Sequence, residues 1–189
     1  MADSKRLLAL KRLTAHLESD VSIERGYKHD LAGKVFRGRA KYNHEEEGGV
    51  GVPLVALLES PDADRFPLRP GWQDGIESAT QRDRWTILVQ GWVADDKANP
   101  TDPAYELMAD VKKSLARLLQ DRVQQTRAGP QVNPNYDPER FMLGGLITSL
   151  DIEPGTVRPP MEQVSSNAFF WMRVVLGFTE DTNDPYNLD

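Results

Sequence analysis

The chain has 189 residues, of which 39% are hydrophobic and 28% charged, values typical of a globular protein with a single core. It contains no cysteine, which excludes a disulfide framework, thiolate zinc sites and cysteine nucleophiles. The net charge of −6 argues against a nucleic-acid binder, because such proteins need a basic surplus to neutralise phosphates. We therefore expect one domain over residues 1–189, made in a reducing compartment.

Leucines recur at helical spacing near the N-terminus and predict a helix over residues 4–19. Its apolar stripe is formed by Leu7, Leu10, Leu13 and Leu17. Such a stripe must pack on something, and the sheet is the available partner. The segment is basic and apolar but lacks a small-residue cleavage site, so we interpret it as a helix of the fold and not as a signal peptide. Residues 20–30 are interpreted as a polar connector.

Residues 34–42 alternate and predict a strand with a basic row on one side, formed by Arg37, Arg39 and Lys41. Charges at period two normally face water; an intersubunit or lumen-facing row is the alternative. Glycines and acids mark residues 43–51 as a turn, and a second strand is predicted over 52–59. Residues 61–83 show no periodicity and predict a long loop, which in a compact domain is usually functional or mobile.

Residues 84–119 carry the clearest pattern of the chain. A strand is predicted over 85–94, with one face free of charge and the other mixed. The uncharged face is formed by Trp85, Ile87, Val89, Gly91 and Val93. Asp102 and Pro103 then predict a helix start, with Asp as the cap and Pro in the first position. Apolar residues at spacings of three and four follow, so this helix is expected to cover the uncharged face.

The C-terminal third predicts a second irregular insertion over residues 120–140, which contains Gly-Pro, Asn-Pro and Asp-Pro pairs. Strands are predicted over 145–152 and 167–179, with a turn-rich connection between them and an acidic tail over 180–189 that frays. Helices do not alternate with every strand. The predicted fold class is therefore α+β: a mainly antiparallel sheet of about four to five strands, with two helices on one face and long protruding loops.

The histidines give weak signals for chemistry. His16 lies in the first predicted helix, and the His29-Asp30 dipeptide could be an oriented acid–base pair but has no nucleophile motif beside it. His44 and the three glutamates after it offer hard metal ligands, yet consecutive residues in a turn rarely form a closed site. We interpret this segment as an acidic, solvated turn.

Two other polar segments have structural interpretations. Asp95 and Asp96 are expected to end a strand and begin a polar turn, and the glycines at residues 48–51 lack the Lys-Ser/Thr pair of a phosphate-binding loop. We predict no catalytic residue, no cofactor and no metal site. A small enzyme that uses His29, His44 or the Asp95-Asp96 pair is the alternative hypothesis.

Aromatic side chains outside the predicted core suggest an interface. Trp72 lies in a proline-rich loop, where it either plugs the core or contacts a partner. Trp92, Phe169 and Trp171 lie on the mixed faces of the two long strands, and loops or a neighbouring subunit must cover them. The candidate interface residues are Arg37, Arg39, Lys41, Arg65, Arg69, Trp72, Trp92, Arg158 and Trp171.

Four segments carry a family resemblance: LLALKRLTAHLE, GYKHDLAGKVFRGR, VPLVALLE and RWTILVQGWVADDKANPTDPAYELMADVKKSL. In this order they resemble the tail terminator (tail completion) proteins of tailed bacteriophages, of the lambdoid tail-terminator type. The resemblance covers about residues 4–179 and rests on the order and texture of the segments. Its most specific part is the W-x-I-x-V-x-G-W-V strand with the polar turn and helix that follow.

The resemblance implies a small fold of helices against a mainly antiparallel sheet, assembled as a homohexameric ring at the neck end of the virion tail. Such rings, assembled in the host cytoplasm, stop polymerisation of the tail tube protein and present a surface to a head-side connector protein. Genome DNA passes through the lumen without specific binding, and no catalysis or cofactor is involved. The family has no active-site motif to carry over. Another head–tail connector component, a stopper or an adaptor, is the alternative.

Overall fold

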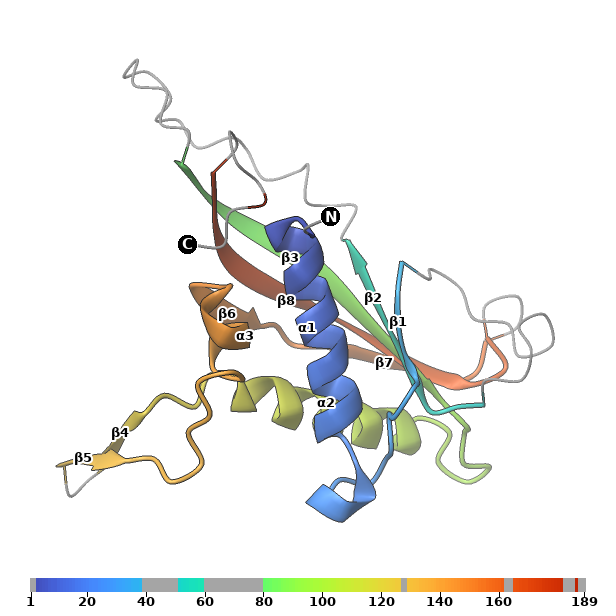
Figure 1. Ribbon diagram of the computed structural model, residues 1–189. Helices are drawn as coiled ribbons and strands as arrows, with labels where there is room; N and C mark the ends of the chain where they lie inside the picture. The colour runs from blue at the N-terminus through green and yellow to red at the C-terminus, as the bar shows by residue number, and fades with distance from the viewer. Residues whose placement is uncertain are drawn as a thin grey trace.

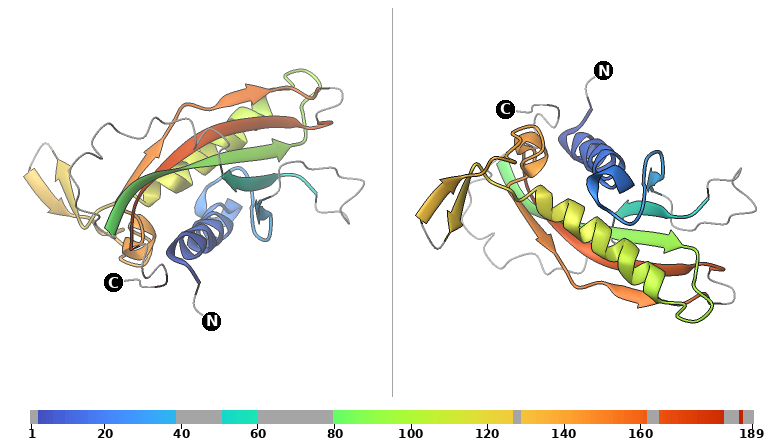
Figure 2. Two further views of the ribbon diagram at one scale, coloured as in Figure 1. Left: turned by 90° about the horizontal axis from the view of Figure 1, so that it is seen from above. Right: turned by 90° about the horizontal axis from the view of Figure 1, so that it is seen from below.

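A computed structural model describes residues 3–38, 51–59, 80–126, 129–161, 165–181 and 186 of the chain. Within them, six strands form one sheet, and two long helices pack on one of its faces (Figures 1 and 2). The elements are α1 (Lys5–Asp20), η1 (Ile23–Arg25), β1 (Val35–Arg37), β2 (Leu54–Glu59), β3 (Thr80–Val93), α2 (Asp102–Arg117), β4 (Val123–Thr126), β5 (Gly129–Val132), α3 (Met142–Gly145), β6 (Ser149–Ile152), β7 (Thr156–Arg158) and β8 (Ala168–Asp181).

The sheet has the strand order β1-β2-β3-β8-β6, and β7 also pairs with β8. Every pair is antiparallel except β1 with β2. The predicted α+β class with a mainly antiparallel sheet is therefore confirmed. The sheet has six strands where four to five were predicted, because the connection over residues 153–160 contains β7. The sequence of that segment has turn residues, but β8 offers its free edge there and the backbone pairs with it.

β3 and β8 form the centre of the sheet and pair over their full 14 residues. The predicted uncharged face is confirmed: Ile87 and Val89 are fully buried, and they lie opposite Val174 and Met172 of β8. β3 begins at Thr80, inside the segment predicted to be a loop. Residues 80–84 have no apolar alternation, and backbone pairing with the last residues of β8 makes them a strand.

Gly91 provides the space for a core aromatic ring. A Cβ atom at this position would lie 2.2 Å from Cε1 of Phe170, which faces it from β8. Phe170 is fully buried and belongs to the main core, together with residues of α1 and α2. A glycine in the middle of this strand is therefore a packing requirement.

α1 begins as predicted, with Ser4 capping the backbone N–H of Leu7 at 3.4 Å. Its packed stripe follows Ala9, Leu13 and Leu17 at intervals of four, and all three are fully buried. Leu7 was expected in this stripe but is 40% exposed, because Ala9 and not Leu7 continues the line of Leu13 and Leu17.

α2 covers the uncharged face of β3, as predicted. Leu107, Val111 and Leu115 are fully buried in the same core cluster as Ile87 and Val89. Thr101, not Asp102, is the N-cap residue, and it makes no side-chain capping bond. Asp102 and Pro103 occupy the first turn, where an acid suits the helix dipole and proline needs no hydrogen bond.

The remaining predictions need correction in their details. β1 spans only three residues in the described part of the strand predicted over 34–42. The insertion predicted as irregular over 120–140 contains the hairpin of β4 and β5. The strand predicted from residue 145 begins at Ser149, because Gly145 is the last residue of α3 and has a φ of 80°, which is not extended. Residues 43–50 of the predicted turn and most of the tail lie outside the described residues.

The second face of the sheet, which we call the open face, lies opposite α1 and α2 (Figure 2). A small apolar cluster occupies it, with Leu54, Ala56 and Trp92 buried at its centre. Phe36, Val52 and Phe169 pack around them and are partly buried. The open face is therefore apolar at one end, whereas Arg84 and Asp151 form an exposed ion pair of 2.9 Å elsewhere on it.

Candidate functional site

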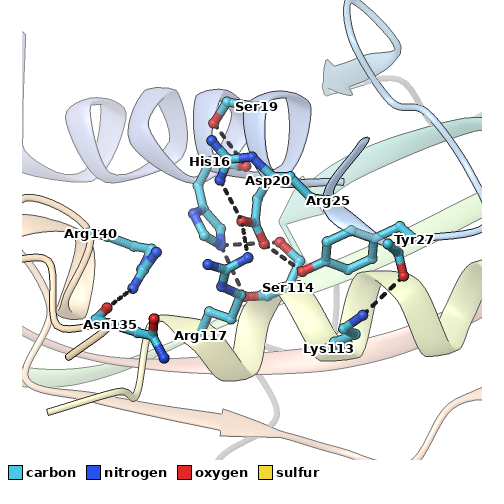
Figure 3. Close-up of polar contacts among 11 residues, drawn as sticks. His16, Ser19, Asp20, Arg25, Tyr27, Lys113, Ser114, Arg117, Asn135 and Arg140 are labelled. Atoms are coloured by element: carbon cyan, nitrogen blue, oxygen red, sulfur yellow. Dashed lines mark hydrogen bonds and ion pairs between the residues drawn. The ribbon is translucent and has the colours of Figure 1, made fainter. Parts of the chain in front are cut away.

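The most buried charge in the described residues, Asp20, lies at the C-terminal end of α1 (Figure 3). It is 1% exposed. Its Oδ1 accepts from Arg117 of α2 at 2.8 Å and from Arg25 of η1 at 3.1 Å. Its Oδ2 accepts from the Tyr27 hydroxyl at 2.6 Å. One carboxylate thus joins α1, α2 and the connector between α1 and β1.

The partners of Asp20 keep it ionised. Burial alone would raise the pKa of this carboxyl, but hydrogen bonds from Tyr27 and Ser114 and the charge of Arg117 outweigh it, and the pKa is lowered. Burial raises the pKa of the Tyr27 hydroxyl, and its bond to Asp20 raises it further. The connector over residues 20–30, interpreted from its sequence as polar, is exposed over most of its length but contributes Val21 and Tyr27 to the core.

His16, Ser114 and Asp20 are the residue types of a hydrolase triad, but they are connected differently. Nε2 of His16 lies 3.0 Å from the Ser114 carbonyl oxygen and 3.1 Å from its hydroxyl. The carbonyl needs an N–H donor, so Nε2 cannot also take the hydroxyl proton. In a triad the carboxylate holds the other ring nitrogen, whereas here Asp20 accepts from Ser114 itself. Ser114 is fully buried. The cluster joins α1, which carries His16, to α2, which carries Ser114.

Desolvation is the largest effect on His16 and lowers its pKa. The bond to the Ser114 carbonyl opposes this shift without cancelling it. The imidazole is therefore neutral at pH 7, as a buried joint between α1 and α2 requires.

A cavity of about 780 Å³ lies beside this cluster, between α1 and the turn before α3. Its lining contains three arginines and three acidic residues, so the charges balance. They are Arg12, Arg25, Arg140, Asp20, Asp137 and Glu139. Arg12 is held by the Leu143 carbonyl at 2.7 Å and Arg140 by the Asn135 carbonyl at 2.5 Å. Neither sign of charge prevails in the cavity, so its lining does not define one class of ligand.

His29 pairs with Asp110 and not with its sequence neighbour Asp30. Its Nδ1 lies 2.8 Å from Oδ2 of Asp110 on α2, and the backbone N–H groups of Lys28 and His29 donate to the same oxygen at 2.9 and 3.1 Å. Asp30 accepts from the backbone N–H of Ala32. The His29-Asp30 pair, which the sequence left open as an alternative, is not formed, and Asp110 fastens the connector to α2.

The other polar segments agree with their structural interpretations where the structure describes them. Asp96 accepts from the backbone N–H groups of Asn99 and Ala98, which lower its pKa, in the exposed turn after β3. His44, Gly48 and Gly49 lie outside the described residues. No group of three or more His, Asp or Glu side chains that could hold a metal ion occurs in the described part of the chain.

Three of the candidate interface residues meet at one end of the open face. Register places Trp171 opposite Gln90, and it places Trp92 and Arg158 opposite Phe169. Trp92 is only 6% exposed, so the chain covers this side chain itself. Trp171 and Phe169 stack at 5.9 Å and are half-buried, and the Arg158 guanidinium lies 5.7 Å from the Trp171 ring. We call Phe169, Trp171 and Arg158 the aromatic cluster.

The other candidate interface residues do not join this group. Arg37 is exposed and lies on β1, at the opposite edge of the sheet from β7. Its neighbours in the predicted basic row, Arg39 and Lys41, lie outside the described residues, as do Arg65, Arg69 and Trp72.

Sequence reasoning missed a projecting hairpin, which we call the hairpin arm: β4 and β5, residues 123–126 and 129–132. Within the described residues these strands pair only with each other. Val123 and Val132 are directly opposite in register, and they are 46% and 74% exposed. The β-branched residues Val123 and Thr126 favour a short strand, but the Gly-Pro dipeptide after them suggested irregular structure.

The sequence matches no protein-family model and no curated protein sequence. None of the described helices has both the length and the apolar composition needed to span a membrane. The surfaces described above and the resemblance of the four sequence segments are therefore the grounds for a function.

Proposed function

We propose that the protein is a structural subunit that assembles into a ring at the head-proximal end of a phage tail tube, where it stops tube polymerisation and offers a surface for joining to the head. The observation that carries the proposal is the one-sided sheet. Both long helices lie on one face, while the other face ends in half-buried aromatic rings beside an exposed arginine. Such a face suits contact with another protein, since aromatic residues and Arg are enriched at interfaces.

The buried polar groups support a role that depends on shape. Asp20, Asp110 and His16 each hold α2 against an earlier part of the chain. Each of them makes a hydrogen bond or ion pair of 3.0 Å or less across its joint. A subunit that must present fixed surfaces to neighbours benefits from such joints, because fully satisfied buried polar networks make a core rigid.

The proposed partners are further copies of the chain, the tail tube protein and a head-side connector protein. A hexamer is the proposed ring, at the neck end of the virion tail. The net charge of −6 suits a lumen through which DNA passes, because like charges keep the DNA from adhering.

Electron microscopy tests the proposal directly. The purified protein is imaged alone and after mixing with polymerising tail tube protein, with tube protein alone as the control. We expect rings in the first sample, and in the second, tubes that carry a ring at one end and stop growing. Protein that stays monomeric and leaves the tube length unchanged would refute the proposal. Rings that bind the head-side connector but never a tube end would identify a stopper or an adaptor.

A further inference from the structure

The charges around the cavity beside Asp20 are balanced in the lining itself but not in the network that the lining belongs to. The Asp20 carboxylate is shared by two cations: Arg25, which lines the cavity, and Arg117, which reaches it from α2. The three arginines of the lining and Arg117 make four, against three acidic residues. The residue types of the lining define no ligand class, but the pairing of these charges leaves one positive charge unmatched.

The cavity lining contains two arginines that no acidic side chain neutralises. Arg12 donates to the Leu143 carbonyl at 2.7 Å. Arg140 donates to the Asn135 carbonyl at 2.5 Å. Both acceptors are neutral, and within the described residues neither guanidinium forms an ion pair. Since a guanidinium has five N–H donors, each of these side chains has donors left for a ligand.

The Arg140 guanidinium is incompletely satisfied by the protein. Its Nε atom is buried and has no hydrogen-bond partner in the part of the chain that the structure describes. A buried donor without an acceptor costs free energy, so such a group gains from any acceptor it can reach. Arg140 lies on the side of His16 away from Tyr27 (Figure 3). An anion in the cavity supplies the missing acceptor once this side chain turns toward it.

The acidic side chains of the lining leave these two arginines available. Both oxygens of Asp20 are occupied by Arg25, Arg117 and Tyr27. Oδ1 of Asp137 accepts from the backbone N–H groups of the next two residues but one, Glu139 and Arg140, at 3.0 and 3.3 Å. The exposed Glu139 carboxylate forms no hydrogen bond or ion pair among the described residues. Glu139 is thus the acid with which a ligand competes.

The cavity also has a fixed wall and the size of a ligand site. A Cβ atom at Gly144 would lie 2.3 Å from the Nη1 atom of Arg12, so this glycine makes room for the guanidinium. Ala15 and Pro138 line the cavity too and are exposed, which gives it apolar surface. Its volume of about 780 Å³ falls within the usual range of small-molecule sites, about 300–1,000 Å³.

We infer that this cavity binds a small organic anion, whose carboxylate or phosphate group is held by Arg12 and Arg140. Arginine recognises both groups through paired N–H donors in one plane. The apolar part of the ligand lies against Ala15 and Pro138. This site goes beyond the proposed ring function, and neither depends on the other.

Isothermal titration calorimetry of the full-length protein at constant ionic strength tests the site. The probes are phenyl phosphate, benzoate and benzyl alcohol, which share a phenyl ring and differ in the attached group. The two anions distinguish a phosphate from a carboxylate, and the alcohol measures the apolar contribution alone. We expect at least one anion to bind with a Kd of about 1 mM or lower. Benzyl alcohol should bind at least about tenfold more weakly, because it offers the arginines no charge.

Four variants locate the site, and circular dichroism melts confirm that each is folded. Arg12→Gln and Arg140→Gln should each raise the Kd of the anion about tenfold or more, because each removes a charged donor. Arg158→Gln removes the same charge near the other end of α2 and should change the Kd less than about twofold. Glu139→Gln should lower the Kd about two- to fivefold, because it removes the competing carboxylate. A variant that only loosened the fold would not bind more tightly.

The outcomes decide the inference separately from the ring function. Binding of phenyl phosphate alone assigns a phosphate ligand and binding of benzoate alone a carboxylate, and either result supports the site. If neither anion binds, or if benzyl alcohol binds as tightly as the anions, the inference is wrong. It is also wrong if Arg140→Gln and Glu139→Gln both leave the Kd unchanged. Electron microscopy of the same protein preparation tests the ring, so one proposal can fail while the other stands.

Discussion

The substitution Asp20→Ala tests how strongly the buried carboxylate joins the two helices. It leaves the Arg117 guanidinium, whose side chain is 27% exposed, and the Tyr27 hydroxyl without their acceptor. Removing one partner of a buried ion pair costs about 3–5 kcal/mol. The Arg25 side chain is half-exposed, so its guanidinium can hydrogen-bond with water once the carboxylate is removed. We therefore expect the free energy of unfolding to fall by the lower value of this range, about 3 kcal/mol. For a chain of this size that lowers the melting temperature by about 6–12 °C.

Urea denaturation at pH 7, followed by tryptophan fluorescence, measures this loss. The matched control is Asp151→Ala, which removes an Asp–Arg pair of similar length, 2.9 Å to Arg84, whose side chains are 60% and 66% exposed. Exposed pairs contribute about 0–1 kcal/mol, so the control should change little. If the two variants lose the same stability within about 0.5 kcal/mol, burial does not set the strength of the Asp20 network and the reasoning fails.

Three further variants test the core and its pH dependence. Val89→Asp should give no folded protein by circular dichroism, because it buries a charge at a cost of several kcal/mol; a folded variant would show that the β3 register is wrong. Gly91→Ala should cost about 1–3 kcal/mol in urea denaturation, because its Cβ would lie 2.2 Å from a Phe170 ring atom. The pKa of His16 is lower in the folded state, so the unfolded chain binds more protons below pH 6.5 and stability should fall as the pH drops from there. In His16→Gln, urea midpoints at pH 7 and pH 5 should differ less than in the wild type; an equal difference would exclude His16 as the cause.

Periodicity in the sequence was sufficient to predict the parts of the fold that depend on one buried face. The alternation around Val89 and the spacing of Leu107, Val111 and Leu115 predicted β3, α2 and their contact, and the structure confirms all three. The wholly apolar alternation of residues 168–178 likewise predicted β8. These patterns are reliable because burial against a single core requires apolar residues at the period of the element itself.

Pairing along a sheet edge and contacts between distant side chains leave no such pattern. β7 is a strand only because β8 extends beside it, and the first residues of β3 are ordered in the same way. The His29–Asp110 pair joins residues 81 positions apart, and the His16–Ser114 pair joins residues 98 apart. Each residue looks like a surface polar residue in its own segment, and only the packing of α2 brings the partners together.

These polar joints bear on the proposed assembly because α2 lies between the hairpin arm and the aromatic cluster. The hairpin arm follows the C-terminal end of α2, and the aromatic cluster lies near its N-terminal end. Closure of a ring requires a fixed rotation between successive copies, since a heterologous contact with a variable angle gives open chains. Asp20 holds α2 near its last turn and Asp110 lies near its middle, so α2 is attached to the earlier chain at two points. These joints thereby hold α2, with the arm at one of its ends and the cluster at the other, against the earlier part of the chain.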